Sequence, residues 1–355
     1  MILRKHNNNR QVITVQNNIL VSMLFVLSAV SATLAQAQGP IPALAYAREG
    51  RQLQAIPGPE QNLPTITAQQ WFKVSDKGLQ LEGPSFDRDG NLLFVEVFGG
   101  QVLKLDTRKK LSVVVEKNPL GSAGLAIHKD GRLFVAGLGN FKDTGNLTAY
   151  NADGSDPQAI IAGARNFLVD DLVFDNAGGF YFTDFKGTST EPTGGVYYVA
   201  PGSTAIVPIL PKLAIANGIA LSPDGKTLWV TEFATGLLHR IELKDAQTIA
   251  PFGEAVVYRF NGPSPDSMRV DEDGNLYVAM YSQGRVLVLN PNGQPIGQIL
   301  IPGRENGHFL RSTSTALKPG TNEVYLVASD GDLGEGSAIF RAQGFAKALK
   351  LYSHQ

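Results

Sequence analysis

Six copies of one short pattern recur along the chain at intervals of 41 to 49 residues. Each copy has a few apolar residues, a turn containing Gly, and then an alternating run rich in Val, Leu, Phe, Tyr and Thr. The copies are FDRDGNLLFV (86–95), IHKDGRLFV (127–135), FDNAGGFYFTD (174–184), LSPDGKTLWVTE (221–232), VDEDGNLYVAM (270–280) and LKPGTNEVYLVA (317–328). Internal periods of this length are typical of array architectures, in which each repeat is one small structural unit.

The composition of each copy favours strands over helices. The glycine of each turn can adopt the positive φ that a tight hairpin requires; these glycines are Gly90, Gly131, Gly178, Gly225, Gly274 and Gly320. No stripe with the period of a helix runs through the repeats. Four short strands in about 45 residues make one blade of a β-propeller, so we predict an all-β, six-bladed β-propeller. A β-sandwich with similar hairpins is the alternative, but it does not explain the regular spacing.

The first residues have the pattern of an export signal. Basic residues precede an apolar run of 12 residues (19–30), and Ala35-Gln36-Ala37 is a small-x-small cleavage site. The alternative is an uncleaved membrane anchor, for which the run is short, since a span needs about 20 residues. We therefore expect a signal peptide (1–37), a lead-in segment (38–70) and the propeller (71–355), in a protein that is periplasmic or secreted.

Charge and composition exclude several classes of function. The 31 Lys and Arg residues nearly balance the 32 Asp and Glu residues, and no basic patch stands out, so we expect no nucleic-acid partner. The chain has no Cys, which excludes disulfides and thiolate metal sites. No later segment is long and apolar enough to span a membrane, so no membrane association is expected after signal cleavage. The oligomeric state is not indicated.

The propeller prediction brings one set of residues together. The first strand of each blade lines a central channel, so residues at the same register in the six blades meet around the axis. Eight positions before the turn glycines, the repeats carry Glu82, Ala123, Asp170, Asn217, Asp266 and, with one extra turn residue, Ser312. Four of these positions thus hold the oxygen-bearing side chains of Glu82, Asp170, Asn217 and Asp266.

Three carboxylates in a narrow channel would repel one another unless a cation binds or their pKa values rise. Oxygen ligands without His or Cys favour a hard ion, most naturally Ca²⁺. The alternative is that each residue is an isolated turn cap or a polar residue at a strand end. The common register of the four residues argues against this alternative. Strict alternation along a strand also predicts that Asp171, next to Asp170, points to the opposite side.

Several stretches resemble the senescence-marker-protein (regucalcin)/gluconolactonase family. They include KGLQLEGPSFDRDG (77–90), VDDLVFDNAGGFYFTDFKG (169–187), IANGIALSPDGKTLWVTE (215–232) and DEDGNLYVAMYSQGRVLVLN (271–290). The resemblance implies a six-bladed propeller, one catalytic calcium and hydrolysis of lactones, which are small-molecule substrates. It assigns the calcium ligands to Glu82, Asp170, Asn217, Asp266 and Ser267, and the role of general acid/base to Asp266.

The resemblance is incomplete at a second, structural calcium site that some relatives have. Asp143 and Gly145 match that loop, but the segment that follows lacks the expected carboxylate and has Arg165 instead. We therefore do not assign a second ion.

Residues outside the ligand set leave the function partly open. His308, Arg311 and Tyr281 are candidates for the rim of the pocket, although each is equally well explained as an ordinary surface or turn residue. The alternative function is a non-enzymatic exported propeller that binds a ligand or partner and uses calcium only for stability.

Overall fold

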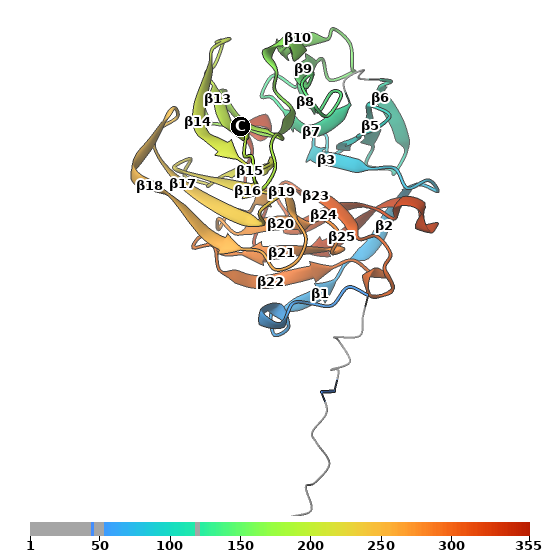
Figure 1. Cartoon of the computed structure of the whole chain (residues 1–355). Helices are drawn as coiled ribbons and strands as arrows, with labels where there is room; N and C mark the ends of the chain where they lie inside the picture. The colour runs from blue at the N-terminus through green and yellow to red at the C-terminus, as the bar shows by residue number, and fades with distance from the viewer. Residues whose placement is uncertain (1–43, 46–52, 118–120) are drawn as a thin grey trace, which may run out of the picture. The chain divides into compact units, whose positions relative to one another are not determined.

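The computed structural model describes residues 44–45, 53–117 and 121–355, and the predicted signal peptide lies outside them. The strands form six sheets of four or five strands each, which confirms the six-bladed propeller (Figure 1). Short 3-10 helices connect some of them: η2 (Gly58–Glu60), η3 (Gly163–Arg165), η4 (Arg304–Asn306), η5 (Gly331–Leu333) and η6 (Tyr352–His354). No helix in the described part of the chain has the length and apolarity to cross a membrane.

Blades 1 to 4 each use four consecutive strands. Blade 1 consists of β3 (Leu81–Phe86), β4 (Leu92–Glu96), β5 (Gln101–Leu105) and β6 (Leu111–Val115). Blade 2 consists of β7 (Ser122–Ile127), β8 (Leu133–Gly137), β9 (Asn146–Tyr150) and β10 (Gln158–Ile161). Blade 3 consists of β11 (Val169–Phe174), β12 (Phe180–Asp184), β13 (Gly194–Val199) and β14 (Ile206–Leu213). Blade 4 consists of β15 (Ala216–Leu221), β16 (Thr227–Glu232), β17 (Leu237–Asp245) and β18 (Thr248–Arg259).

The last two blades each include a strand from the start of the propeller. Blade 5 consists of β19 (Pro265–Val270), β20 (Leu276–Met280), β21 (Arg285–Leu289), β22 (Pro295–Leu300) and the parallel strand β1 (Thr65–Thr67). Blade 6 consists of β23 (Arg311–Leu317), β24 (Glu323–Ser329), β25 (Ser337–Gln343) and β2 (Gln69–Ser75). Because β2 pairs with β25 near the C-terminus, it closes the ring. The predicted lead-in segment therefore contains β1, and its predicted end at residue 70 falls inside β2.

The hydrophobic core is divided among the blade interfaces. Six clusters of buried side chains each lie between two neighbouring blades, and together they run around the whole ring. Blades 3 and 4, for example, meet through Tyr181, Ile219 and Val230. Since burying one large apolar side chain contributes about 1.5–3 kcal/mol, the ring is stabilised by packing between blades, without disulfides.

The first strands of the blades (β3, β7, β11, β15, β19 and β23) contact one another in a closed circle around the axis. Each begins at one face of the ring, which we call the ligand face, and runs to a tight turn at the opposite hairpin face. The glycines of these turns have positive φ values, as predicted: Gly90 (80°), Gly131 (93°), Gly178 (91°), Gly225 (69°), Gly274 (83°) and Gly320 (75°). The repeat turns therefore fix which end of every first strand points to which face.

The C-terminal segment (344–355) covers the channel at the hairpin face. Arg88 Nε of blade 1 donates to the Ser353 carbonyl at 2.7 Å, and the Tyr352 ring packs 5.1 Å from that of His128 in blade 2. On the other side, Glu272 N of blade 5 donates to the Lys347 carbonyl at 2.8 Å. A cavity of about 80 Å³ remains beneath this segment, lined by residues 349–353 and the ends of first strands. The channel is thus closed at this end.

Candidate metal centre

The four residues selected by register occupy one position in four blades. Glu82, Asp170, Asn217 and Asp266 are each the second residue of the first strand, in β3, β11, β15 and β19. In all four blades the pairing register of the first two strands shifts at this point, as in a β-bulge. Bulges redirect side chains and are frequent next to active sites. The predicted common register is therefore confirmed, and Ala123 and Ser312 occupy the same position in β7 and β23.

The carboxylates of blades 1, 3 and 5 influence one another electrostatically. Burial, followed by the charges of Glu82 and Asp171, raises the pKa of Asp170 well above its usual value. Burial, followed by the charges of Glu82 and Asp170, does the same to the pKa of Asp266. Removal from water also raises the pKa of Glu82 to about 8, against a hydrogen bond from Gly83 N. The site therefore concentrates negative charge in a poorly solvated place, which favours a bound cation.

Asn217 gives independent support for a ligand at this place. Its side chain is buried, and its Oδ1 accepts no hydrogen bond from the described residues. A buried carbonyl oxygen without a partner is costly, whereas a hard cation would satisfy it. Across the described ranges, no group of three His, Cys, Asp or Glu side chains is arranged to hold a metal ion. The donor types thus fit Ca²⁺ when the Asn217 oxygen is included, although the three carboxylates do not form a ready-made cluster.

Ser267, the fifth ligand implied by the family resemblance, follows Asp266 in β19 and is buried. Its backbone N–H donates to Asp266 Oδ1 at 3.1 Å. The Asn217 side chain also opposes the rise in the pKa of Asp266. The Ser267 N–H therefore helps to orient the Asp266 carboxylate.

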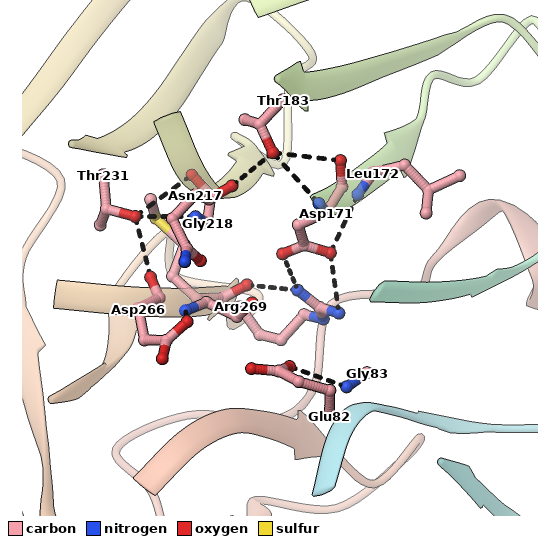
Figure 2. A network of polar contacts seen from close by, with 12 residues as sticks. Glu82, Gly83, Asp171, Leu172, Thr183, Asn217, Gly218, Thr231, Asp266 and Arg269 are labelled. Atoms are coloured by element: carbon pink, nitrogen blue, oxygen red, sulfur yellow. Dashed lines mark hydrogen bonds and ion pairs between the residues drawn. The ribbon is translucent and has the colours of Figure 1, made fainter. Parts of the chain in front are cut away.

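Asp171 does not point away from the channel, contrary to the prediction from strict alternation. Arg269 Nη1 of blade 5 donates to Asp171 Oδ2 of blade 3 at 2.9 Å, and both side chains are largely buried. Alternation fails because the shift between Val169 and Leu172 interrupts it. Figure 2 shows the Arg269 guanidinium between the Asp171 and Glu82 side chains. Arg269 also lines the cavity under the C-terminal segment, so this ion pair forms the floor of the candidate site.

Two of the three predicted rim residues lie near the carboxylates. Tyr281 and Arg311 are bridge partners between blades 5 and 6. Burial raises the pKa of Tyr281, Arg311 opposes the rise, and the charges of Asp266 and Glu82 add to it. His308 is instead held by Asp330, 3.2 Å from its Nδ1. The structure therefore brings Tyr281 and Arg311 to the site and gives His308 a local partner.

An aromatic row at the ligand face was not predicted from the sequence. The Phe185, Phe233 and Tyr281 rings follow the second strands of blades 3, 4 and 5, with centroids 6.0 and 5.9 Å apart. A cavity of about 570 Å³ lies beside Phe233, lined by residues 233–236 and 259–264, which end two positions before Asp266. The sequence pattern that could have predicted this row is an aromatic residue directly after three of the repeated strands.

The loop proposed for a second ion is held together internally. Asn140 Nδ2 donates to Asp143 Oδ1 at 2.8 Å, and Gly145 bridges to Phe167. Arg165 lies in η3, exposed to solvent. The segment with Arg165 does run beside this loop, and a second ion remains unassigned.

Comparison with known proteins gives a consistent result. Residues 81–310 match the family described as SMP-30/gluconolactonase/LRE-like region. The chain is 50% identical over 316 residues to Lactonase drp35 of Staphylococcus saprophyticus subsp. saprophyticus, covering 88% of this chain and 98% of that protein. It is 49% identical over 323 residues to Lactonase drp35 of Staphylococcus aureus (strain bovine RF122), covering 90% of this chain and 99% of that protein.

Solved structures share the fold at much lower identity. The calcium-binding protein regucalcin of Agrobacterium tumefaciens has a TM-score of 0.65 at 19% identity, covering 81% of this chain and 98% of that chain. A gluconolactonase of Xanthomonas campestris has a TM-score of 0.63 at 17% identity, covering 78% of this chain and 95% of that chain. At these identities the likeness concerns the fold alone.

Proposed function

The chain belongs to the SMP-30/gluconolactonase/LRE-like family, and on that premise we propose that it is a calcium-dependent lactonase. Relatives of about 50% identity over nearly their whole length are named lactonases. One structural observation carries the assignment to a site. Glu82, Asp170, Asn217 and Asp266 occupy the same second position of four first strands, and the buried Asn217 oxygen has no partner among the described residues.

Glu82, Asp170, Asn217, Asp266 and Ser267 are the residues that would hold the cation. Their side chains offer oxygen donors only, which suits Ca²⁺ better than a softer metal. When bound, calcium supplies a Lewis acid that polarises the lactone carbonyl and stabilises its developing negative charge. The neighbouring Arg269 guanidinium reduces the excess negative charge without competing as a ligand.

Asp266 is proposed as the general acid/base. Its carboxylate accepts a proton from the water that attacks the lactone carbonyl, and it returns that proton to the ring oxygen as the C–O bond breaks. The Ser267 N–H, which donates to Asp266 Oδ1 at 3.1 Å, helps to hold the carboxylate in one orientation. A group that must accept and release a proton benefits from this fixed placement, because proton transfer requires hydrogen-bond distance.

The substrate is proposed to reach this site from the ligand face. The C-terminal segment covers the opposite end, whereas a cavity of about 570 Å³ lies at the ligand face beside Phe233. Tyr281 and Arg311 at the rim would contact the part of the substrate that is not reacting.

The second candidate function is a non-enzymatic propeller stabilised by calcium. A structural ion needs no proton-transfer group, so Asp266 separates the two functions. The test is a pH-stat assay with aryl, aldono- and acyl-homoserine lactones, before and after removal of calcium with a chelator. We expect at least one class to be hydrolysed, activity to vanish on chelation and to return with added Ca²⁺. Bound calcium without hydrolysis of any class would favour the binding propeller.

Export is a separate proposal that rests on residues 1–37, whose charged, apolar and small-residue regions follow the order of a signal peptide. We propose cleavage after Ala37 and a periplasmic or secreted mature protein. Intact-mass measurement of the protein from its native host tests this, and a mass that includes residues 1–37 would refute cleavage.

A further inference from the structure

Two buried threonines occupy equivalent positions behind the candidate ligands. Thr183 is the last residue but one of β12, and Thr231 is the last residue but one of β16. Both side chains are fully buried. Neither belongs to the predicted ligand set, and their hydroxyl groups contact the backbone of the first strands.

Each hydroxyl bridges two neighbouring blades (Figure 2). Thr183 Oγ1 donates to the Asn217 carbonyl at 2.6 Å and accepts from Asp171 N at 3.1 Å. Thr231 Oγ1 donates to the Asp266 carbonyl at 2.8 Å and accepts from Gly218 N at 2.8 Å. Each threonine thus joins the residue after one ligand to the backbone of the next ligand.

The bulges explain why these hydroxyls are needed. The register shift between Ala216 and Ile219 interrupts the ladder at Gly218, so the Gly218 N–H requires another acceptor. The next blade lies very close, because a Cβ at position 218 would be 2.5 Å from the Asp266 carbonyl oxygen. Thr231 therefore satisfies a buried donor and a buried acceptor at the point where two ligand-bearing strands touch.

Among the second strands, only β12 and β16 have threonine at the last position but one. The position before the end of the second strand is Val95, Ala136, Ala279 and Ala328 in blades 1, 2, 5 and 6. At the ends of their second strands these blades have no hydroxyl; where blade 6 meets its neighbours, the hydroxyls come from its first strand instead, with Ser312 donating to the Met280 carbonyl and Thr313 to the Leu81 carbonyl. Blades 3 and 4 differ from the others because each has one of these four ligands on its own first strand and is followed by a blade that also has one. Asp170 of blade 3 is followed by Asn217 of blade 4, and Asn217 is followed by Asp266 of blade 5.

We propose that Thr183 and Thr231 are positioning residues that set the spacing of Asp170, Asn217 and Asp266 around the cation. The inference rests on the proposed function, since it takes these three side chains as ligands. The two threonines have different effects: Thr183 fixes a residue that only binds the cation, whereas Thr231 fixes the residue that also transfers the proton.

The test compares Thr183→Val, Thr231→Val and Thr231→Ser with wild type by calcium titration in a calorimeter. Valine keeps the shape and loses the hydroxyl, while serine keeps the hydroxyl. Thr315→Val is the matched control, because Thr315 is fully buried in β23 and its Oγ1 contacts no polar group of the described chain. Melting curves recorded with chelator report on folding independently of the cation.

We expect both hydroxyl-deleting variants at the two sites to bind calcium about 10- to 100-fold more weakly, as is typical when a residue supporting a ligand is lost. Thr231→Ser and Thr315→Val should bind within about threefold of wild type. At saturating calcium, Thr183→Val should regain wild-type kcat, whereas Thr231→Val should keep a reduced kcat.

Wild-type calcium affinity in a folded Thr231→Val would overturn the inference. If Thr231→Val did not fold, the calcium affinities of Thr183→Val and Thr231→Ser would test the inference instead. Wild-type protein that binds calcium but hydrolyses no lactone would refute the proposed activity and leave the affinity result standing. Wild-type protein that binds no calcium would refute both.

Discussion

Arg269 Nη1 lies 2.9 Å from Asp171 Oδ2, although the two residues are 98 positions apart and belong to blades 5 and 3. Because blade 4 lies between these blades, the ion pair spans the channel. It places one positive charge beneath Glu82, Asp170 and Asp266. Without it, the carboxylates of Glu82, Asp170, Asp171 and Asp266 would lose this buried counter-charge.

Removing this counter-charge should destabilise the protein strongly. Arg269→Met leaves Asp171 buried and unpaired, which typically costs about 3–5 kcal/mol. Urea denaturation of the calcium-free protein measures the loss. The double variant Arg269→Met/Asp171→Asn should recover part of the stability, because it also removes the uncompensated charge. A loss below about 1 kcal/mol in Arg269→Met would show that the pair does not bear on folding.

Calcium should stabilise the native state by linkage. A ligand that binds only the folded protein adds about 2.7 kcal/mol at 100 times its Kd, so chelation should lower Tm. Asp170→Ala should abolish that sensitivity, because it removes a proposed ligand. Calorimetric scans with chelator and with excess Ca²⁺ make the comparison. An unchanged Tm after exhaustive chelation, with no metal by elemental analysis, would refute the site.

His239 should make stability depend on pH. Its Nε2 lies 2.8 Å from Glu232 Oε2 and its Nδ1 lies 3.1 Å from Glu254 Oε1. Burial alone would lower the pKa of His239, but the two carboxylates reverse the effect and raise it above 6.5. Burial alone would raise the pKa of Glu232, but the hydrogen bonds that Glu232 accepts from His239 and from Ala214 N outweigh this effect and lower it.

The direction in which stability changes with pH follows from these two pKa shifts. A raised histidine pKa gives stability that is complete below about pH 6.5 and is lost as pH rises through the folded value. The lowered pKa of Glu232 gives stability that is present above about pH 4.5 and is lost as pH falls. His239→Gln should therefore cost most, about 1.5–3 kcal/mol, between these limits. Free energies of unfolding from pH 4 to 9 test this, and a constant difference across that range would contradict it.

The C-terminal segment should stabilise the ring from outside the blades. It contacts blade 1 through Arg88, blade 2 through His128 and blade 5 through Glu272. Deleting residues 345–355 should lower the free energy of unfolding by at least about 2 kcal/mol, since the Tyr352 packing alone is worth roughly that much. Lys350→Ala, at an exposed position, is the control and should change little. Equal stability of the truncated protein would show that the segment is only a cover.

The repeat was sufficient to predict the blades and the ligand register. Six turn glycines mark the same point of each blade, and the first strands run a constant length back from them, so counting found Glu82, Asp170, Asn217 and Asp266. The closure of blade 6 was not predictable in this way. Strand β2 pairs with β25, as Gln69 with Arg341, and no local pattern encodes a pairing over such a distance.

The error at Asp171 has a specific cause. The sequence period of two assumes a regular strand, whereas the bulge after Val169 turns two successive carboxylates toward the channel. The contacts of the two threonines could not be predicted from the sequence for a related reason. Thr183 and Thr231 look like ordinary strand residues until the backbone of the next blade is placed beside them.

Turnover of Asp266→Asn under a calcium titration, beside Glu82→Gln, tests the assignment of the catalytic centre most directly. Asparagine keeps an oxygen for the cation but cannot transfer a proton at neutral pH, so kcat should fall by about 10²–10⁴ and stay low at saturating calcium. Glu82→Gln should bind calcium more weakly and recover much of its activity at high calcium. If saturating calcium restored Asp266→Asn to wild-type turnover, Asp266 would be only a ligand and the proposed acid/base role would be wrong.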